Sequence, residues 1–178
     1  MLVHIIGEKN NMKCIQPIGQ YFVIQEMVSL NYWLGNQGSN EFEDATDYQI
    51  ACETEMYIKK IDYGEFEILI IGEEPTQMFV YEFEGNHYFV RWIYAPKNFN
   101  IEEHKLIIAN LNVSSQIEQS FNIKFRNLDL VLHHAAYVGS EDPEVYEFRA
   151  LSNNILIDTY SYEPDEEIKM IVHKFNYC

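Results

Sequence analysis

The chain has 178 residues, of which 47% are hydrophobic, and its 28 acidic residues outnumber 12 lysines and arginines to give a formal net charge of −16. This length fits one domain with its own hydrophobic core, and the apolar content excludes a disordered acidic tail. The charge disfavours binding to nucleic acid or anionic lipid and favours a cationic partner, although an acidic surface can also serve solubility alone.

The cysteines and the apolar segments indicate a cytoplasmic protein. Cys14, Cys52 and Cys178 form no Cys-x-x-Cys pair, so neither a disulfide framework nor a zinc site is indicated. The first residues do not combine a basic start with a long apolar run, and no segment approaches the roughly 18 apolar residues of a membrane span. We therefore expect no secretion signal and no membrane anchor.

The first part of the chain is predicted to alternate strands with short helical turns. Residues 14–24 have the pattern of a broken strand region, and the mixed apolar spacing of residues 25–34 predicts a short helix. Residues 35–46 are small, polar and acidic, which predicts a loop with a mobile tip. Thr46 or Asp47 then has the side-chain oxygen needed to cap a single helical turn.

The remainder of the chain is predicted to be rich in strands. Aromatic residues make up 15% of the chain, mostly tyrosine and phenylalanine, which favours half-buried strands. Apolar runs bounded by turn residues predict further strands at residues 56–62, 66–71, 77–83, 88–94, 121–126, 128–134, 145–151, 155–162 and 168–175. The first four of these are predicted to form one antiparallel meander. The clearest helix is predicted at residues 100–112, where apolar side chains recur at helical spacing.

These elements predict a mainly β fold with one to three short helices. We expect an antiparallel β-sandwich or a partly open barrel of about ten strands, with the helix covering one end. The chain is predicted to form a single compact domain, residues 1–178. A division into two lobes, residues 1–95 and 113–178 joined by the helix at 100–112, is an alternative.

No residue pattern predicts catalysis or metal binding. Glu73 and Glu74 are adjacent, so in a strand they point to opposite faces and do not act on one bond. The same geometry separates His133 from His134, and the histidine spacing matches no metal-site motif. Because nucleophile signatures and glycine-rich phosphate loops are also missing, we expect no enzyme activity, no metal and no cofactor.

The acidic residues are concentrated in the first half of the chain. Between Cys14 and Val90 there are fourteen acidic residues against Lys59 and Lys60, whereas from Pro96 onwards thirteen face seven cations. A field of one sign favours capture of a cationic partner, although it also suits a solvated face with no partner. The predicted contact surface comprises Glu41, Glu43, Asp44, Asp47 and Tyr48 of the loop region, with Glu73 and Glu74 beside Pro75.

Several short motifs occur in order along nearly all of the chain. They are PIGQYFVI (17–24), YWLG (32–35), DYQIAC (47–52), IIGEEP (70–75), FVRWIYA (89–95), and ILIDTYSYEPD (155–165) followed by MIVHKF (170–175). In this arrangement the chain resembles the immunity protein 21 family of bacterial polymorphic toxin systems. The resemblance implies a small, non-catalytic cytoplasmic protein that binds and neutralises a cognate protein toxin, and it supplies no catalytic residues.

A second function remains open at this point. The tyrosines and phenylalanines, if exposed, suit a non-catalytic β-sandwich module that binds a small molecule or a glycan by stacking. Neither the identity of the toxin nor the oligomeric state follows from the sequence.

Overall fold

The structure is a computed structural model of the chain, and it describes residues 12–16, 21–72, 77–110 and 117–177. Its strands are β1 (Lys13–Ile15), β2 (Phe22–Glu26), β3 (Ile58–Tyr63), β4 (Phe66–Ile71), β5 (Met78–Phe83), β6 (Asn86–Tyr94), β7 (Ile117–Lys124), β8 (Asp129–His134), β9 (Tyr146–Arg149), β10 (Asn154–Asp165) and β11 (Ile168–Tyr177). The helical elements are α1 (Asp47–Cys52), α2 (Ile101–Asn110) and the 3₁₀ turns η1 (Met27–Tyr32), η2 (Gly35–Gln37) and η4 (Gly139–Glu141).

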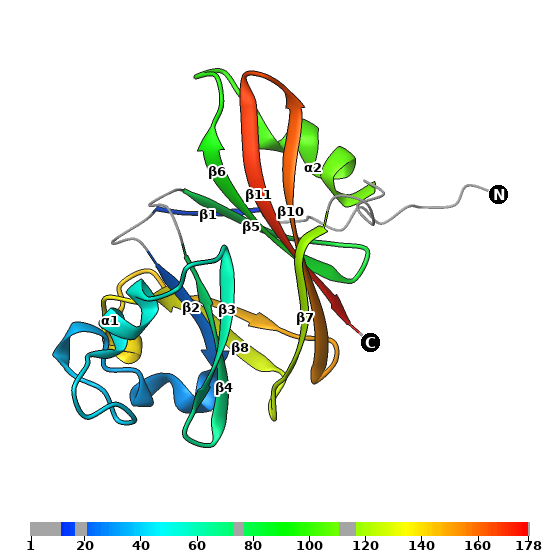
Figure 1. Cartoon of the computed structure of the whole chain (residues 1–178). Coiled ribbons are helices and arrows are strands. Elements are labelled where there is room, and N and C mark those ends of the chain that lie inside the picture. Colours follow the sequence, from blue (N-terminus) through cyan, green and yellow to red (C-terminus); the bar gives the residue numbers. More distant parts are fainter. Residues whose placement is uncertain (1–11, 17–20, 73–76, 111–116, 178) are drawn as a thin grey trace.

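The strands form two antiparallel sheets that pack face to face (Figure 1). The six-stranded sheet has the order β1-β5-β6-β11-β10-β7, and the five-stranded sheet has the order β3-β4-β2-β8-β9. Each sheet keeps two edge strands and does not close into a barrel. The predicted mainly β fold and its sandwich form are therefore confirmed.

Between β4 and β5 the chain passes from one sheet to the other, within the segment where a single meander was predicted. β3 pairs with β4 in the five-stranded sheet, whereas β5 pairs with β6 in the six-stranded sheet. The prediction of one four-stranded meander was wrong, because strand pairing depends on which faces are covered and not on sequence order alone. Each sheet also contains strands from both halves of the chain, so the boundary at residues 95–113 does not separate two groups of strands.

The main hydrophobic core lies between the sheets. In β4, Leu69 and Ile71 face this core, whereas Ile68 and Ile70 face the opposite side of the sheet. All four side chains are fully buried. The continuous apolar run of β4 therefore follows from a strand that is covered on both faces.

Helical segments cover the outer faces of both sheets. On the six-stranded sheet, Ile101 and Ile108 of α2 pack with Tyr160 and Met170. On the five-stranded sheet, Trp33 and the residues leading to α1 pack over the outer side chains of β2 and β4. The predicted helix thus covers a sheet face and not the end of the sandwich, because the outer face of the six-stranded sheet is itself apolar.

The predicted helix at residues 25–34 was also partly wrong. Gln25 and Glu26 belong to β2 and are 0% and 1% exposed. The helical part begins at Met27 and is a 3₁₀ turn. Glu26 is held in the sheet because its carboxylate accepts hydrogen bonds from Arg126 N–H (2.7 Å) and Asn127 Nδ2 (2.7 Å), which local sequence spacing does not reveal.

Candidate functional site

The acidic loop, residues 38–46, lies on the outer side of the five-stranded sheet between η2 and α1 (Figure 1). Glu41, Glu43 and Asp44 are exposed. None of these three carboxylates has an ion-pair partner among the described residues. Their negative charges therefore face the solvent and are not neutralised by an ion pair with a described residue.

Hydrogen bonds hold the acidic loop in a defined shape. The Ser39 hydroxyl accepts from Glu41 N–H and Phe42 N–H, both at 3.1 Å. Asn40 Nδ2 donates to the Tyr32 carbonyl oxygen at 2.6 Å, and the Phe42 ring packs edge-on against Tyr63. The loop is thus anchored by its own side chains, although its composition alone predicts a mobile tip.

A capping box ends the loop and starts α1. Thr46 Oγ1 accepts from Gln49 N–H at 3.1 Å, and Gln49 Oε1 accepts from Thr46 N–H at 2.8 Å. These reciprocal bonds satisfy backbone donors that the first turn of a helix leaves free. Of the two predicted capping residues, Thr46 is the cap.

Asp47 lies inside the protein, and its predicted place on the contact surface is therefore corrected. Its side chain is 0% exposed. Asp47 Oδ2 accepts from Leu34 N–H at 2.6 Å, and its carboxylate accepts from the Tyr63 hydroxyl at 2.8 Å. Burial raises the pKa of Asp47 despite these bonds, and burial with the adjacent carboxylate raises the pKa of Tyr63 to about 12. Asp47 therefore stabilises the acidic loop through buried hydrogen bonds.

The other predicted contact residues have different positions. Tyr48 is half-buried and packs edge-on against Tyr21, so its ring is only partly available. Glu73 and Glu74 lie outside the described residues. The structure therefore brings together Glu41, Glu43 and Asp44 as exposed members of the predicted set.

The turn between β3 and β4 lies against the acidic loop. Gly64 has φ +60, and a Cβ at this position would come within 2.5 Å of Glu41 Oε1. The next residue, Glu65, is exposed and pairs with Arg126 at 2.5 Å. A shallow cleft of about 370 Å³ adjoins the other side of the loop and includes Glu43 and Asp44 in its walls.

The adjacent histidines of the sequence, His133 and His134, lie in β8. No group of three or more His, Cys, Asp or Glu residues there could hold a metal ion. His133 and His134 face opposite sides of β8, as the strand geometry predicts. Gln25 Nε2 lies 2.8 Å from His133 Nε2, while His134 Nδ1 lies 2.8 Å from Asp142 Oδ2.

Comparison of the chain with known proteins identified no similar protein. Neither models of known protein families, nor curated proteins, nor solved structures match this chain. Within the described ranges, no helix has the length and apolar character needed to cross a membrane.

Sequence reasoning missed the residues that support the site. Tyr63, Ser39 and Leu34 hold the loop and Asp47, but they lie up to 29 positions apart and share no spacing motif. The position of Tyr63 at a strand end beside Gly64 indicates only a hairpin. The acidic loop itself was recognisable because its composition differs from that of its neighbours.

Proposed function

We propose that this chain is an immunity protein that binds a cationic protein toxin through the acidic loop and neutralises it by occlusion. The observation that carries this proposal is the exposure of three unpaired carboxylates, Glu41, Glu43 and Asp44, on one anchored loop. The motif resemblance to the immunity protein 21 family supports the same function. In this proposal the protein acts stoichiometrically, without catalysis, in the cytoplasm of the toxin-producing cell.

The chemistry of the loop suits a toxin that acts on nucleic acid. Such an enzyme uses lysine and arginine to hold phosphate, and carboxylates can occupy the same cationic surface in place of the substrate. The net charge of −16 would steer the encounter and raise the association rate. A loop already held by hydrogen bonds loses less conformational entropy on binding than a mobile one.

Neutralising the loop tests the proposal. The triple variant Glu41→Gln, Glu43→Gln, Asp44→Asn is expected to weaken binding by about 10-fold to 100-fold, mainly through slower association. The probe is the protein encoded beside this gene, and the measurements are its affinity by calorimetry at two salt concentrations and cell survival on co-expression. The weaker binding should also show a smaller dependence on salt.

A matched control separates a local effect from net charge. The variant Glu147→Gln, Glu166→Gln, Glu167→Gln also removes three negative charges from exposed positions, but away from the acidic loop. It is expected to bind nearly as well as the wild type. Two results would contradict the placement of the contact surface on the loop. In one, both triple variants bind as tightly as the wild type, and in the other, both lose the same amount of affinity.

The described residues do not favour a glycan-binding module. Among their tyrosine, phenylalanine and tryptophan side chains, Tyr32 and Tyr94 are the ones that are largely exposed, each at 45%. Tyr32 packs against Phe66, with the ring centroids 5.4 Å apart. A stacking platform of several exposed rings is therefore not present in this part of the chain.

A further inference from the structure

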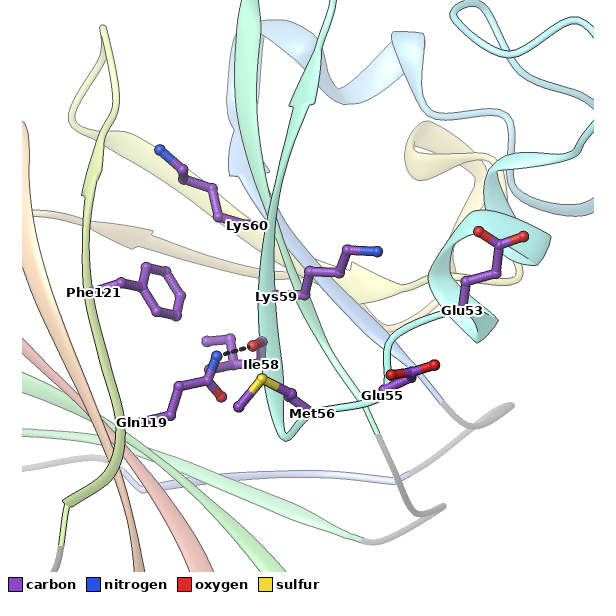
Figure 2. Close-up of a pocket in the computed structure, with 8 residues that line it drawn as sticks. All are labelled: Glu53, Glu55, Met56, Ile58, Lys59, Lys60, Gln119 and Phe121. Carbon is purple, nitrogen blue, oxygen red and sulfur yellow. Dashed lines mark hydrogen bonds between the residues drawn. The ribbon is translucent and has the colours of Figure 1, made fainter.

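A β-bulge in β7 turns two adjacent side chains toward the same cleft. Thr159 of β10 pairs with Gln119, whereas the next residue, Tyr160, pairs with Ile117, so Glu118 is an extra residue in β7. Adjacent residues of a regular strand point to opposite faces, and a bulge removes this restriction. Glu118 and Gln119 therefore both line one cleft, which we call the bulge cleft, where β7 lies beside the start of β3 (Figure 2).

The bulge cleft has a volume of about 210 Å³ and an acidic rim. Its other lining residues are Glu55, Met56 and Tyr57, from the segment that leads from α1 into β3. Glu55 and Glu118 are both exposed, and neither has an ion-pair partner among the described residues. No lysine or arginine of the described ranges lines this cleft. Two carboxylates at one opening repel each other, and a cation between them relieves this repulsion.

Gln119 adds a hydrogen-bond acceptor that no described residue uses. Its Nε2 donates to the Ile58 carbonyl oxygen at 2.6 Å, which fixes the orientation of the amide. Its Oε1 is shielded from solvent and accepts no hydrogen bond from a described residue, an arrangement that costs free energy. In Figure 2 this oxygen points toward the Met56 side chain, which is 52% exposed. Because methionine is flexible, Met56 can turn outward and admit a donor to the oxygen.

A larger cleft continues from the bulge cleft between β3 and β7 (Figure 2). It has a volume of about 440 Å³ and shares Glu55, Met56 and Gln119 with the bulge cleft. The Phe121 ring extends into it from β7 toward β3. Together the two clefts offer carboxylates, one amide oxygen and an apolar wall. This combination fits a long side chain with an apolar stem and a cationic end.

The lysines that line the larger cleft do not neutralise the bulge cleft. Lys60 Nζ pairs with Glu67 Oε1 at 2.8 Å. Lys59 extends to the side of β3 opposite Phe121, which is the side where Glu53 lies (Figure 2). Neither lysine lines the bulge cleft. Its carboxylates therefore remain available to a cation from outside the chain.

We propose that the bulge cleft receives an arginine side chain of the cationic protein partner, an assignment that rests on the proposed function for the identity of that partner. The planar guanidinium has five N–H donors, so it can donate to Gln119 Oε1 and to the carboxylates of Glu55 and Glu118 together. Its methylene stem would lie in the larger cleft beside Phe121. The acidic loop precedes α1 and Glu55 follows it by three residues, so the two surfaces lie at opposite ends of one short helix.

A small probe tests the site without any toxin. In NMR spectra, N-acetyl-arginine amide at millimolar concentrations is expected to shift the Gln119 side-chain amide and Met56 methyl signals in a saturable way. N-acetyl-citrulline amide keeps the shape and N–H donors but has no charge, and it should bind at least about 10-fold more weakly. N-acetyl-lysine amide lacks the planar fork and should fall between the two. No shifts with the arginine compound, or equal binding of the citrulline compound, would overturn the proposal.

Substitutions of the carboxylates connect the probe with the protein partner. The double variant Glu55→Gln, Glu118→Gln removes two exposed charges and is expected to weaken binding of the arginine compound by about 10-fold. It should weaken binding of the protein encoded beside this gene by a similar factor. The control variant Glu84→Gln, Glu147→Gln makes the same charge change at exposed positions in the β5–β6 turn and in β9. It should leave both affinities nearly unchanged.

The two proposals fail in different ways. If the neighbouring protein does not bind the wild-type chain, the proposed function fails, and the arginine compound still decides whether the bulge cleft binds a guanidinium. If that protein binds the wild type and both double variants equally well, an arginine in the bulge cleft is ruled out, whereas binding through the acidic loop stands.

Discussion

The substitution Asp47→Ala is expected to lower the free energy of unfolding by about 3 kcal/mol, because two buried donors lose their acceptor. These donors are Leu34 N–H and the Tyr63 hydroxyl, at 2.6 Å and 2.8 Å from the carboxylate. Asp47→Asn keeps one carbonyl oxygen and should cost less, about 1 to 2 kcal/mol. Urea unfolding followed by tryptophan fluorescence measures both changes, since Trp33 packs against Tyr63.

The neighbouring acid supplies the control for Asp47. Asp44 has no ion-pair partner in the described part of the chain and is exposed, so Asp44→Ala should change stability by less than about 0.5 kcal/mol. The two variants are expected to separate the roles of the acids, with Asp47 affecting stability and Asp44 affecting binding. Similar stability losses in both variants would show that burial does not distinguish these two residues.

The second large effect is expected at His134, which links β8 to the residue after β1 and to the segment before β9. Its Nδ1 donates to Asp142 Oδ2 at 2.8 Å, and its Nε2 donates to the Gln16 carbonyl oxygen at 2.8 Å. Because both partners are acceptors, this geometry favours the doubly protonated, cationic ring beside a buried carboxylate, and these contacts raise the pKa of His134. His134→Leu leaves Asp142 without its partner and is expected to cost about 3 kcal/mol or more near pH 6.

The pH dependence of stability follows from the direction of the two pKa shifts. Burial lowers the pKa of His134, but its bonds to Asp142 and Gln16 raise it more, so the folded pKa lies above 6.5. The stability that His134 contributes is complete below pH 6.5 and is lost as the pH rises through the folded pKa. Burial raises the pKa of Asp142, but its hydrogen bonds to His134 and Glu144 lower it by more, so its contribution is complete above pH 3.8 and is lost as the pH falls through the lowered folded pKa.

Urea unfolding between about pH 5.5 and pH 8.5 tests this assignment. His87, His133 and His173 have lowered pKa values and make stability rise with pH near 6.5, so the test is the difference between variants. Relative to the wild type, His134→Leu should lose less stability toward high pH, because it lacks the group whose contribution falls through its raised folded pKa. His87→Phe is the contrasting variant: burial lowers the pKa of His87 to about 4, so the unfolded chain binds a proton near pH 6.5 that the folded chain does not, and His87 makes stability rise with pH through 6.5. His87→Phe should therefore change the slope in the opposite direction to His134→Leu, and an unchanged slope in His134→Leu would contradict the charged pair.

Local signals predicted much of the fold. The bounds of β4 were predicted at the exact residues, because an apolar run between turn residues has clear ends. Helix α2 lies within the predicted range, and the Thr46 cap was one of two candidates. Each of these features depends on residues within a few positions of one another, so spacing is sufficient to find them.

Contacts distant in sequence explain what local spacing missed. The prediction treated Asp47 as one more acid in an acidic stretch, because Leu34 and Tyr63 are 13 and 16 positions away. His133 and His134 were correctly separated to opposite faces, but the partner Asp142 was not identified. The division of β4 and β5 between two sheets likewise depends on strands from the start of the chain, because β4 pairs with β2 and β5 pairs with β1.

The sequence by itself determined the acidic character of the protein, the dominance of strands and the position of the acidic loop, because composition and short-range periodicity carry these properties. Tertiary structure alone decided which acids are available to a partner. Glu41, Glu43 and Asp44 remain exposed, whereas Asp47 is buried against Leu34 and Tyr63. The physical reason is that burial and hydrogen bonding depend on neighbours in space, and in this sandwich most of those neighbours come from distant strands.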